Sequence, residues 1–523
     1  MSKKVVGALL LLVLSVIVVV VAWLLLPMLQ DRHQSHTSDA AKASEKIRIG
    51  VDNWIGYFPL CSQEMKSAMH QAGYILICED DRADYAERMQ RLKNGELDFA
   101  VATVDSYLLN AKAHGFPATI VSVIDESKGG DAILTREKNV NSLDDFKGRN
   151  DLRVAFTPSS PSHYLLKAAA DHFNVPELLP SAGSHRIETA GSEQARDKLF
   201  TGAADVAVLW EPDVSKALEQ EGVKKVLGTE DTQRLIVDIL LVNREYSQKS
   251  PKVVKLLLST YFSILKKYRS DEKLLRKHVK KQTKLTDQQI TVMLSGVHWA
   301  SFNENCEQWF GIGVPGAETE ESLVETLEST AAVLISAGDF STTPIPNNNP
   351  YRLTNSSFLE ELFTQGMGGF SVPANNTVLK ESKDSLEARF TPLDDKGWQK
   401  LKEIGTLRID PIIFQSGSTQ LTLIAKQVVD NTIARLKHYP HFRVIVRGHT
   451  GTRGDTTANE QLSQQRAEAV ARYMTITYSI DQNRLYTEGV GGSMPLEKKS
   501  GESDRAYQYR LPRVELILVR EEI

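Results

Sequence analysis

The sequence predicts an α/β protein with three parts: an N-terminal transmembrane helix, a two-lobed domain and a smaller α/β sandwich at the C-terminal end. The first observation is an uncharged apolar run over residues 5–29. The second is an alternation of short apolar runs with helical periods over residues 46–370, which is typical of α/β domains. The third is the return of this alternation over residues 406–523, after a linker at 371–405 that is rich in proline, asparagine and serine. A chain of 523 residues is too long for one ordinary domain, which agrees with this division.

Residues 1–30 are expected to form an uncleaved anchor in the inner (cytoplasmic) membrane. At 1.5 Å per residue the run can cross a hydrocarbon core of about 30 Å. A cleavable signal peptide has a shorter apolar core and a small-residue exit, whereas this run leaves through Trp23 and offers no cysteine for lipidation. Lys3 and Lys4 precede it, so the positive-inside bias places the N-terminus in the cytoplasm and the bulk of the chain in the periplasm. A buried core helix is the alternative, which the lack of a polar face disfavours. Residues 31–45 read as a polar stalk.

Charge and cysteine content exclude several kinds of site. The formal net charge is −4, so no basic excess indicates a nucleic-acid partner. No CxxC pair or Cys/His cluster has the spacing of a metal site, and we expect neither a metal nor another cofactor. Cys61 and Cys78 can form a disulfide in an oxidising periplasm, which would leave Cys306 unpaired, and buried free thiols are the alternative.

Five segments of the two-lobed region resemble a known family in content and order. They are GVDNWIGYFPL, LKNGELDFAVATVDSYL, VIDESKGGDAILTR, VAFTPSSPSHYLLKAAADHF and KLFTGAADVAVLWEPDVSKAL. Together they resemble periplasmic solute-binding proteins of the nitrate, sulfonate, taurine and thiamine-precursor type. The resemblance implies an ABC-transporter substrate-binding fold whose lobes close on a small anionic solute such as a sulfonate, nitrate or phosphate. A permease or another envelope protein would then be a partner.

Aromatic and hydroxyl side chains follow the predicted strands of the first lobe. Ligands of open α/β sheets lie beyond the carboxyl ends of the strands. Trp54 and Tyr57 follow the first strand and are candidates to wall a ligand. Thr103 and Ser106 follow a later strand and can supply hydroxyl groups. Residues 125–131 contain two glycines and fit the crossover between lobes, where glycine absorbs hinge rotation.

Three serines mark the mouth of a helix in the second lobe. Ser159, Ser160 and Ser162 follow the strand VAF. Free N–H groups and the helix dipole favour an anion at such a mouth. A plain serine N-cap without a ligand is the alternative. His163, next in the chain, reads as a surface histidine rather than a ligand contact.

A tryptophan and a glutamate end another strand of the second lobe. Trp210 and Glu211 can close this lobe on a cationic or hydrogen-bonding part of a ligand. A glutamate before a proline is equally typical of a helix cap.

The C-terminal unit resembles a second family. FQSGSTQL, VRGHT, NEQLSQQRAEAVARYM, RLYTEGVGGSMP and RVELIL occur in the order and at the spacing of peptidoglycan-binding domains of the outer-membrane protein A (OmpA) type. In that family an arginine and an aspartate hold the carboxylate and the ammonium of diaminopimelate. The resemblance implies Arg466 as the arginine, whose planar fork takes a carboxylate through two hydrogen bonds.

Two positions depart from the pattern of this second family. The aspartate that follows the GHT triplet in the family is Gly451 here, and Asp455, four residues on, is the candidate to replace it. The closing Asn-Arg-Arg-Val-Glu motif is Leu-Pro-Arg-Val-Glu over residues 511–515. The remaining candidates for this pocket are Ser416, Thr450, Asn459 and Leu462.

These features predict a membrane-anchored periplasmic protein that captures or senses a small solute and associates with peptidoglycan. A structural tether between membrane and wall, with a ligand-free two-lobed domain, is the alternative. An enzyme is not expected, because the CCCxC iron site of the related pyrimidine synthase is absent and no catalytic triad or carboxylate pair stands out by spacing. A stator-like ion channel is not expected, since residues 5–29 contain no ionisable group.

Overall fold

The computed structural model describes residues 45–180, 185–283, 285–314, 316–367, 390–410, 412, 414 and 418–521. The predicted anchor at 1–30, nearly all of the predicted stalk and residues 371–389 of the predicted linker lie outside these ranges. Among the described residues, no helix has the length and apolar character needed to cross a membrane.

The first lobe is built on a mixed six-stranded sheet with the order β11-β4-β10-β3-β1-β2. Its parallel core pairs β1 with β2 and β3, while β10 runs antiparallel between β3 and β4. The central strands β3 and β10 are buried throughout and almost wholly apolar, because helices cover both faces of the sheet. The strands are β1 (Glu45–Val51), β2 (Tyr74–Asp80), β3 (Phe99–Thr103), β4 (Ala118–Ser127), β10 (Val237–Asn243) and β11 (Val297–Trp299). The helices of this lobe are α2 (Phe58–Cys61), α3 (Gln63–Gln71), α4 (Tyr85–Lys93), α5 (Val104–Ala111), α9 (Arg244–Lys249), α10 (Pro251–Ser270), α11 (Glu272–Thr283), α12 (Asp287–Ser295) and α13 (Phe302–Glu304).

The second lobe has a five-stranded sheet with the order β7-β6-β8-β5-β9. The segments VAF and VAVLW form β6 and β8, which are buried on both faces and pair in parallel. The strands are β5 (Asp131–Thr135), β6 (Val154–Phe156), β7 (Arg186–Glu188), β8 (Val206–Trp210) and β9 (Lys224–Gly228). The helices are α6 (Pro161–His172), α7 (Ser192–Phe200) and α8 (Asp213–Leu218).

The chain crosses between the lobes where the sequence predicts a hinge. Strand β4 of the first sheet ends at Ser127 and β5 of the second sheet begins at Asp131. Gly129 has φ +115°, a backbone conformation that disfavours other residues. A Cβ on Gly130 would lie 2.4 Å from the ring of Trp54, so only glycine permits this close approach. The prediction of the crossover is therefore confirmed.

A C-terminal extension of the two-lobed domain packs along both lobes. Helix α14 (Ser322–Ser336) contacts α5 of the first lobe and α6 of the second. Asp339, just beyond α14, accepts two hydrogen bonds of 2.8 Å from Lys167 of α6. Helix α15 (Ser357–Thr364) packs on α10.

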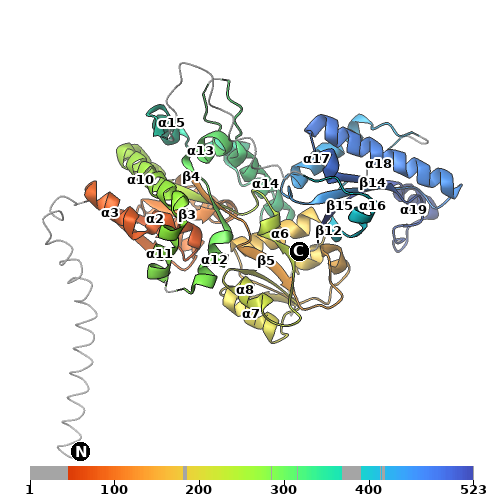
Figure 1. The fold of residues 1–523 in the computed structure, drawn as a ribbon, viewed down its shortest axis with the longest axis horizontal. Helices are drawn as coiled ribbons and strands as arrows, with labels where there is room; N and C mark the ends of the chain where they lie inside the picture. The colour runs from red at the N-terminus through yellow and green to blue at the C-terminus, as the bar shows by residue number, and fades with distance from the viewer. Residues whose placement is uncertain are drawn as a thin grey trace, which may run out of the picture.

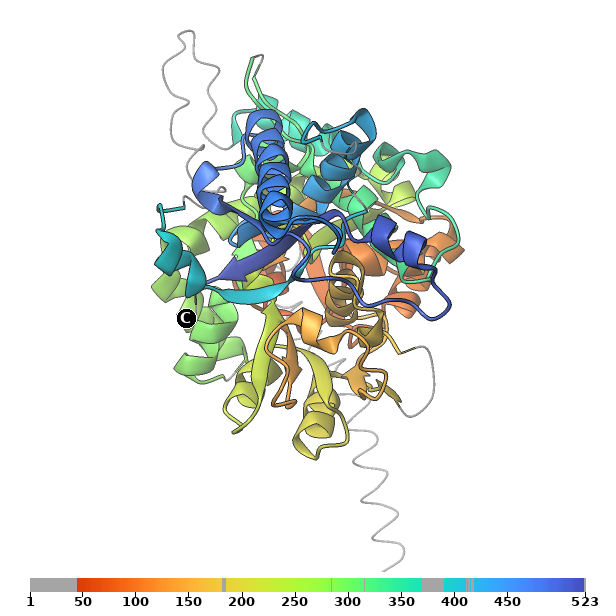
Figure 2. The same cartoon turned by 90° about the vertical axis from the view of Figure 1, so that its right-hand side faces the viewer.

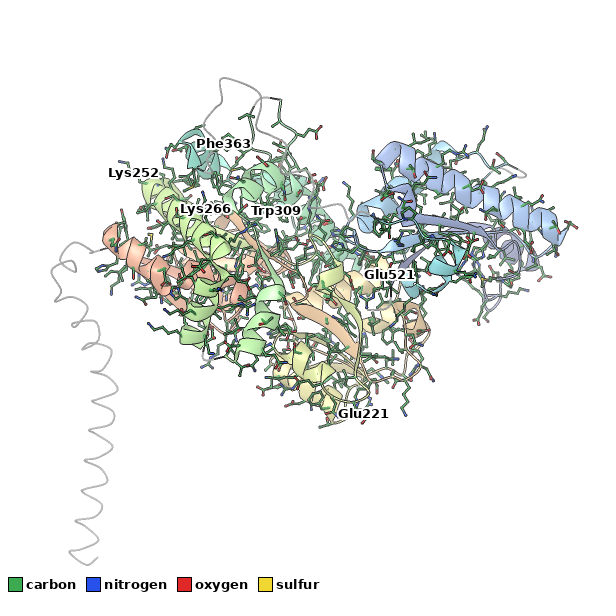
Figure 3. All side chains as sticks on the ribbon, in the orientation of Figure 1. Glu221, Lys252, Lys266, Trp309, Phe363 and Glu521 are labelled. Atoms are coloured by element: carbon green, nitrogen blue, oxygen red, sulfur yellow. A yellow bond between two sulfur atoms is a disulfide. The ribbon has the colours of Figure 1, made fainter. Side chains whose placement is uncertain are left out.

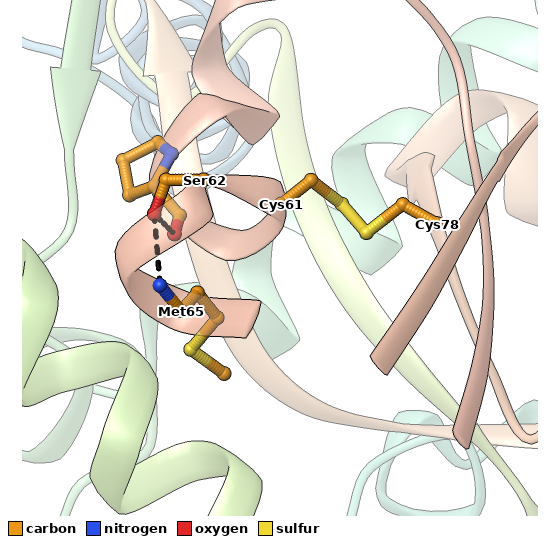
Figure 4. The surroundings of a disulfide bond; sticks show 5 residues. Cys61, Ser62, Met65 and Cys78 are labelled. Atoms are coloured by element: carbon orange, nitrogen blue, oxygen red, sulfur yellow. Dashed lines mark hydrogen bonds between the residues drawn. A yellow bond between two sulfur atoms is a disulfide. The ribbon is translucent and has the colours of Figure 1, made fainter. Parts of the chain in front are cut away.

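A disulfide joins Cys61, at the end of α2, to Cys78 in β2 (Figure 4). The two Cα atoms are 6.1 Å apart. Ser62 follows Cys61 and caps α3 by accepting a hydrogen bond from the Met65 amide. Of the two alternatives left by the sequence, the structure contains the disulfide, and Cys306 is a buried free thiol.

The C-terminal domain is the predicted α/β sandwich. Its four-stranded sheet has the order β12-β15-β13-β14, and alternate residues of β13 face opposite sides. Val444 and Val446 face the helices α17 and α18, whereas Ile445 packs with Trp398 of α16. The strands are β12 (Lys402–Thr406), β13 (Arg443–His449), β14 (Leu485–Gly489) and β15 (Arg513–Arg520). The helices are α16 (Asp395–Gln399), α17 (Leu423–Leu436), α18 (Thr456–Tyr478) and α19 (Asp504–Arg510).

The C-terminal domain docks on the second lobe (Figures 1 and 2). Tyr439 packs edge-on against Phe173, with ring centroids 5.2 Å apart, and its hydroxyl lies 2.8 Å from Nδ1 of His172. Polar contacts surround this apolar centre: Thr406 donates to Asp144, Arg408 pairs with Asp171, and Arg520 pairs with Asp231. The amide of Gln233, in the segment that returns to the first lobe, donates to the His438 carbonyl at 2.8 Å. The two domains thus share one continuous core.

Candidate functional site

A cavity of about 870 Å³ lies between the two lobes. The first lobe lines it with the loop that follows β1 and the loop before α4. The second lobe lines it with the mouths of α6, α7 and α8. These segments follow the carboxyl ends of strands, which is where ligands of α/β sheets bind. A volume of this size suits a small organic solute.

The cavity brings together most of the side chains predicted for it. Trp54, Tyr57, Ser159, Ser160 and Glu211 line it.

Three predicted residues do not line it: Thr103, Ser106 and Ser162. Thr103 and Ser106 form the capping box of α5 instead, with their hydroxyl oxygens 2.7 Å apart. The hydroxyl of Ser162 donates to Asp131. Local hydrogen bonding therefore explains these three residues without a ligand.

A pair of buried carboxyl groups lies on neighbouring strands of the first lobe, and one of them, Asp238, lines the cavity. Asp125 of β4 and Asp238 of β10 are register partners, and both are almost completely buried. Trp54 Nε1 donates to Asp125 at 3.1 Å, and the Tyr57 hydroxyl donates to Asp238. Burial raises the pKa of Asp125 to about 7. Burial and the neighbouring Asp125 charge raise the pKa of Asp238 well above its usual range.

Two further carboxyl groups face the cavity from the second lobe. Asp131 accepts hydrogen bonds from Ser127 and Ser162, and burial raises its pKa to about 6. Glu211 accepts from the amide and the hydroxyl of Ser215 at 3.2 and 2.9 Å, and burial raises its pKa as well. Glu211 precedes Pro212, the N-cap residue of α8, and its carboxylate binds an amide of the first turn of this helix while also lining the cavity.

Acidic side chains dominate the described lining of the cavity. The basic side chain of this lining is Arg82. The acidic residues of the lining are Asp52, Asp84, Asp131, Glu193, Glu211, Asp213 and Asp238.

The mouth of α6 is closed by its own residues. The Ser160 hydroxyl accepts the His163 amide at 3.2 Å, and Pro161 at the first helical position has no N–H to offer. Ser159 adopts φ +58° just before this cap. The plain serine N-cap is therefore present in the structure.

The prediction of a surface position for His163 is wrong. Its side chain is 5% exposed and stacks on Phe156 with ring centroids 4.2 Å apart. Neither ring nitrogen has a hydrogen-bond partner among the described residues. Burial accordingly lowers its pKa to about 3, which keeps the ring neutral.

Sequence reasoning did not single out Asp52 and Asp238 as cleft residues. Asp238 lies inside the apolar strand VDILLVN, and Asp52 directly follows the strand EKIRIGV. A lone carboxylate within or just after an apolar strand is the sequence signal that could have identified both.

The C-terminal domain holds Arg466 in a buried position on α18. The side chain is 6% exposed, its Nε donates to the Ser418 carbonyl at 3.3 Å, and its guanidinium lies 4.9 Å from the ring centre of Phe414. Burial lowers its pKa. No carboxylate pairs with Arg466 among the described residues, so its two terminal nitrogens are suited to a carboxylate from a ligand.

The other residues predicted for this pocket have mixed positions. The Thr450 amide donates to the Gly491 carbonyl at 2.8 Å, beside α18. Asp455 is the N-cap of α18 and accepts from Ala458 at 2.8 Å, while the Asn459 amide donates to the Arg453 carbonyl. Leu462 is half-buried, and Ser416 lies outside the described residues.

Gln508 lies beside the position of the missing aspartate. A Cβ on Gly451 would be 3.1 Å from Oε1 of Gln508, whose Nε2 donates to the Thr452 hydroxyl at 2.8 Å. A neutral amide oxygen therefore lies beside the position at which the resemblance expects an aspartate.

The changed closing motif, residues 511–515, takes part in a largely buried set of contacts. Leu511 is fully buried. Arg513 donates to Glu515 at 2.7 Å, and His449 lies 3.1 Å from the same carboxylate. Burial acts to raise the pKa of Glu515, but the hydrogen bond from His449 and the charge of Arg513 outweigh it and hold the pKa at about 2.

Two family models match the chain. Residues 82–288 match the periplasmic substrate-binding protein of the phosphonate ABC transporter, and residues 413–509 match the OmpA family.

Individual relatives agree with the C-terminal match. The chain is 33% identical over 100 residues to a probable lipoprotein, YiaD, of Escherichia coli, which covers 19% of the chain and 45% of that protein. It is 26% identical over 100 residues to outer membrane protein Omp38 of Acinetobacter baumannii, covering 19% of the chain and 28% of the relative. The chain thus spans less than half the length of these relatives.

A solved structure is similar to the two-lobed region. The periplasmic aliphatic sulphonate binding protein SsuA of Escherichia coli aligns with a TM-score of 0.45 and 19% identity, over 60% of this chain and 99% of that one. The two matched models and the observed fold lead to one identification: the chain joins a periplasmic substrate-binding-protein domain of the ABC-transporter type to a C-terminal domain of the OmpA family.

Proposed function

We propose that this is an envelope protein that captures or senses a small solute in its two-lobed domain and associates with peptidoglycan through its C-terminal domain. It is held in the inner membrane by residues 1–30, with the N-terminus in the cytoplasm and the bulk of the chain in the periplasm. It carries out no chemical reaction on the solute.

The observation that carries this proposal is the cavity between the lobes. Both lobes contribute side chains to it, and the lobes are joined by crossing strands with glycine at the first crossing. This arrangement allows hinge closure around a ligand. Trp54 belongs to the lining and packs against Gly130, so occupancy of the cavity and the position of the hinge are linked.

Arg466 supports the wall-binding part of the proposal. A buried guanidinium without a carboxylate partner is costly, and a ligand carboxylate would offset that cost. The diaminopimelate of the wall peptide supplies such a carboxylate. Its ammonium group would meet Gln508 or Asp455 in place of the usual aspartate.

Binding to isolated peptidoglycan sacculi tests this role of Arg466. Full-length protein in detergent is incubated with sacculi and sedimented, beside Arg466→Ala and the matched control Arg472→Ala. Arg472 is an exposed arginine of the same helix. We expect wild type and Arg472→Ala to sediment equally and Arg466→Ala to stay in the supernatant. Equal sedimentation of all three would show that wall association does not use this arginine.

A structural tether is the second candidate, and the docked C-terminal domain favours it. The shared core between this domain and the second lobe gives the chain a rigid body of the kind a tether needs. A calorimetric screen of small solutes with the full chain separates the two candidates, since a tether would show no saturable heat with any of them.

A further inference from the structure

The charge of the cleft disagrees with the anionic solute that the resemblance implies. Along the described lining the acidic residues outnumber the basic ones, and the basic residue, Arg82, is exposed to solvent. Charges of one sign in a cleft with low-dielectric walls focus the field and concentrate ions of the opposite sign. An anion would meet like charge over most of this surface.

Three acidic residues of the lining already pair with arginine side chains. Asp52 pairs with the buried Arg88 at 3.2 Å, and Arg196 pairs with Asp213 and, at 3.4 Å, with the exposed Glu193. Neither arginine is part of the lining. These three carboxylates have a cationic partner without a ligand.

Three other carboxyl groups of the lining lack such a partner. Asp131, Glu211 and Asp238 are 4%, 6% and 2% exposed. Their hydrogen-bond partners among the described residues are hydroxyl groups, one backbone amide and, for Asp238, the neighbouring carboxyl group of Asp125; none is a lysine, arginine or histidine side chain. Buried carboxylates without a cation are expensive. A cationic ligand would supply the missing charge at this place.

Aromatic rings from both lobes suit the same kind of ligand. Trp54 and Trp210 line the cavity from opposite lobes and are partly exposed. The hydrogen bond from Trp54 to Asp125 fixes the orientation of the first ring. Aromatic faces attract ammonium groups, most strongly when these are desolvated. The α6 mouth, by contrast, is already capped by Ser160.

We propose that the solute carries at least one positively charged nitrogen, as an amine or a quaternary ammonium, and that Asp131, Glu211 and Asp238 balance its charge. This inference rests on the proposed function of the cleft. An anionic group elsewhere on the same solute would lie toward Arg82.

Titration calorimetry with the full-length protein in detergent tests the inference. The probes are putrescine, choline, taurine and propane-1-sulfonate, which differ in the sign and number of their charges. We expect at least one of the three nitrogen-containing probes to bind and propane-1-sulfonate not to bind. Glu211→Gln should weaken that binding roughly tenfold or more, because a charged hydrogen bond becomes a neutral one.

Glu221→Gln is the matched control, because it makes the same change on the outer surface of the same lobe (Figure 3). It should bind like wild type, and thermal unfolding of both variants verifies that they are folded. If propane-1-sulfonate binds, and Glu211→Gln leaves its affinity unchanged or increases it, the inference of a cationic solute is wrong. The cleft would still be a solute-binding site. Failure of all probes to bind, of either charge, would overturn the solute-binding function itself along with this inference.

Discussion

At the scale of single residues, the two sites differ from their expected form by a few charged groups. In the pocket proposed for wall binding, glycine stands where the resemblance expects an aspartate, and in the cleft carboxylates gather where an anion was expected. Each difference changes the charge that a ligand must carry, while the surrounding backbone retains the fold that the resemblance predicts.

Gly451→Asp should strengthen binding to sacculi. The new carboxylate would face the diaminopimelate ammonium, and the nearest atom to the new Cβ is the flexible amide end of Gln508 at 3.1 Å, which can move aside. A charged hydrogen bond in place of a neutral one predicts a gain of roughly tenfold in affinity. Sedimentation over a range of sacculus concentrations measures it. Unchanged affinity would mean that the ammonium already has a full partner.

Binding of a cationic probe should strengthen as pH rises through about 6, the pKa of Asp131. Burial raises this pKa, and the charged group that adds to the effect is Glu211 on the neighbouring strand end. Below this pH the carboxyl group is neutral and attracts a cation weakly, and above it the carboxylate attracts fully. Calorimetry between about pH 5 and pH 8, a range that extends at least about one unit to either side of this pKa, checks the direction in which affinity changes. Asp131→Asn should flatten the profile, and a profile that falls with rising pH would contradict the assignment.

The predicted residues that line the cavity lie just after the ends of strands. Trp54, Tyr57 and Glu211 follow the carboxyl ends of buried strands, and the topology delivers that edge to the cavity. Thr103 and Ser106 also follow a strand, but their hydroxyls bond to each other in a capping box. The sequence does not distinguish a hydroxyl that caps a helix from one that binds a ligand, because both need the same residue at the same position.

At the scale of elements, alternation of strands and helices was enough to predict both α/β domains and the crossover near Gly129. The pairing of Cys61 with Cys78 was left open, since it depends on how far α2 lies from β2 in space. The structure brings these two elements together.

Replacing both cysteines by serine should lower the free energy of unfolding by about 3 kcal/mol, the value for a closed loop of this size. The bond closes a loop with a sequence separation of 17 residues at the start of the first lobe. Urea unfolding of the double variant, beside Cys306→Ser, measures the difference. Reductant should destabilise wild type and leave the double variant unaffected. Equal midpoints for wild type and the double variant would show that the bond does not stabilise this lobe.

At the scale of the whole molecule, the docking of the C-terminal domain on the second lobe could not be predicted from the sequence. The apolar residues at this contact belong to two separate domains: Phe173 is the C-cap of α6, and Tyr439 follows α17. In the sequence, each of these residues is interpreted as part of the core of its own domain. Only the three-dimensional arrangement shows that the two cores are one.

Asp144→Ala should loosen this docking at one edge. Its carboxylate accepts hydrogen bonds from the Thr406 amide at 2.8 Å and hydroxyl at 2.7 Å, which hold β12 against the second lobe. Hydrogen exchange should show faster exchange of the Thr406 amide with unchanged protection along β13. Asp151→Ala, which removes an exposed carboxylate of the same lobe, is the control. Unchanged exchange at Thr406 would mean that the apolar contact alone holds the strand.

If the C-terminal domain binds the wall as proposed, its docking makes the second lobe part of a wall-bound body, while the first lobe begins with β1, directly after the proposed membrane stalk. Cleft closure therefore would not be an internal rearrangement of a freely diffusing receptor. It would swing the membrane-tethered lobe against the wall-tethered one, so that solute occupancy becomes a change in the angle or tension between the two layers of the envelope. Conversely, a change in the spacing of those layers would bias the cleft toward its open or closed form, and the protein would respond to mechanical load as well as to concentration.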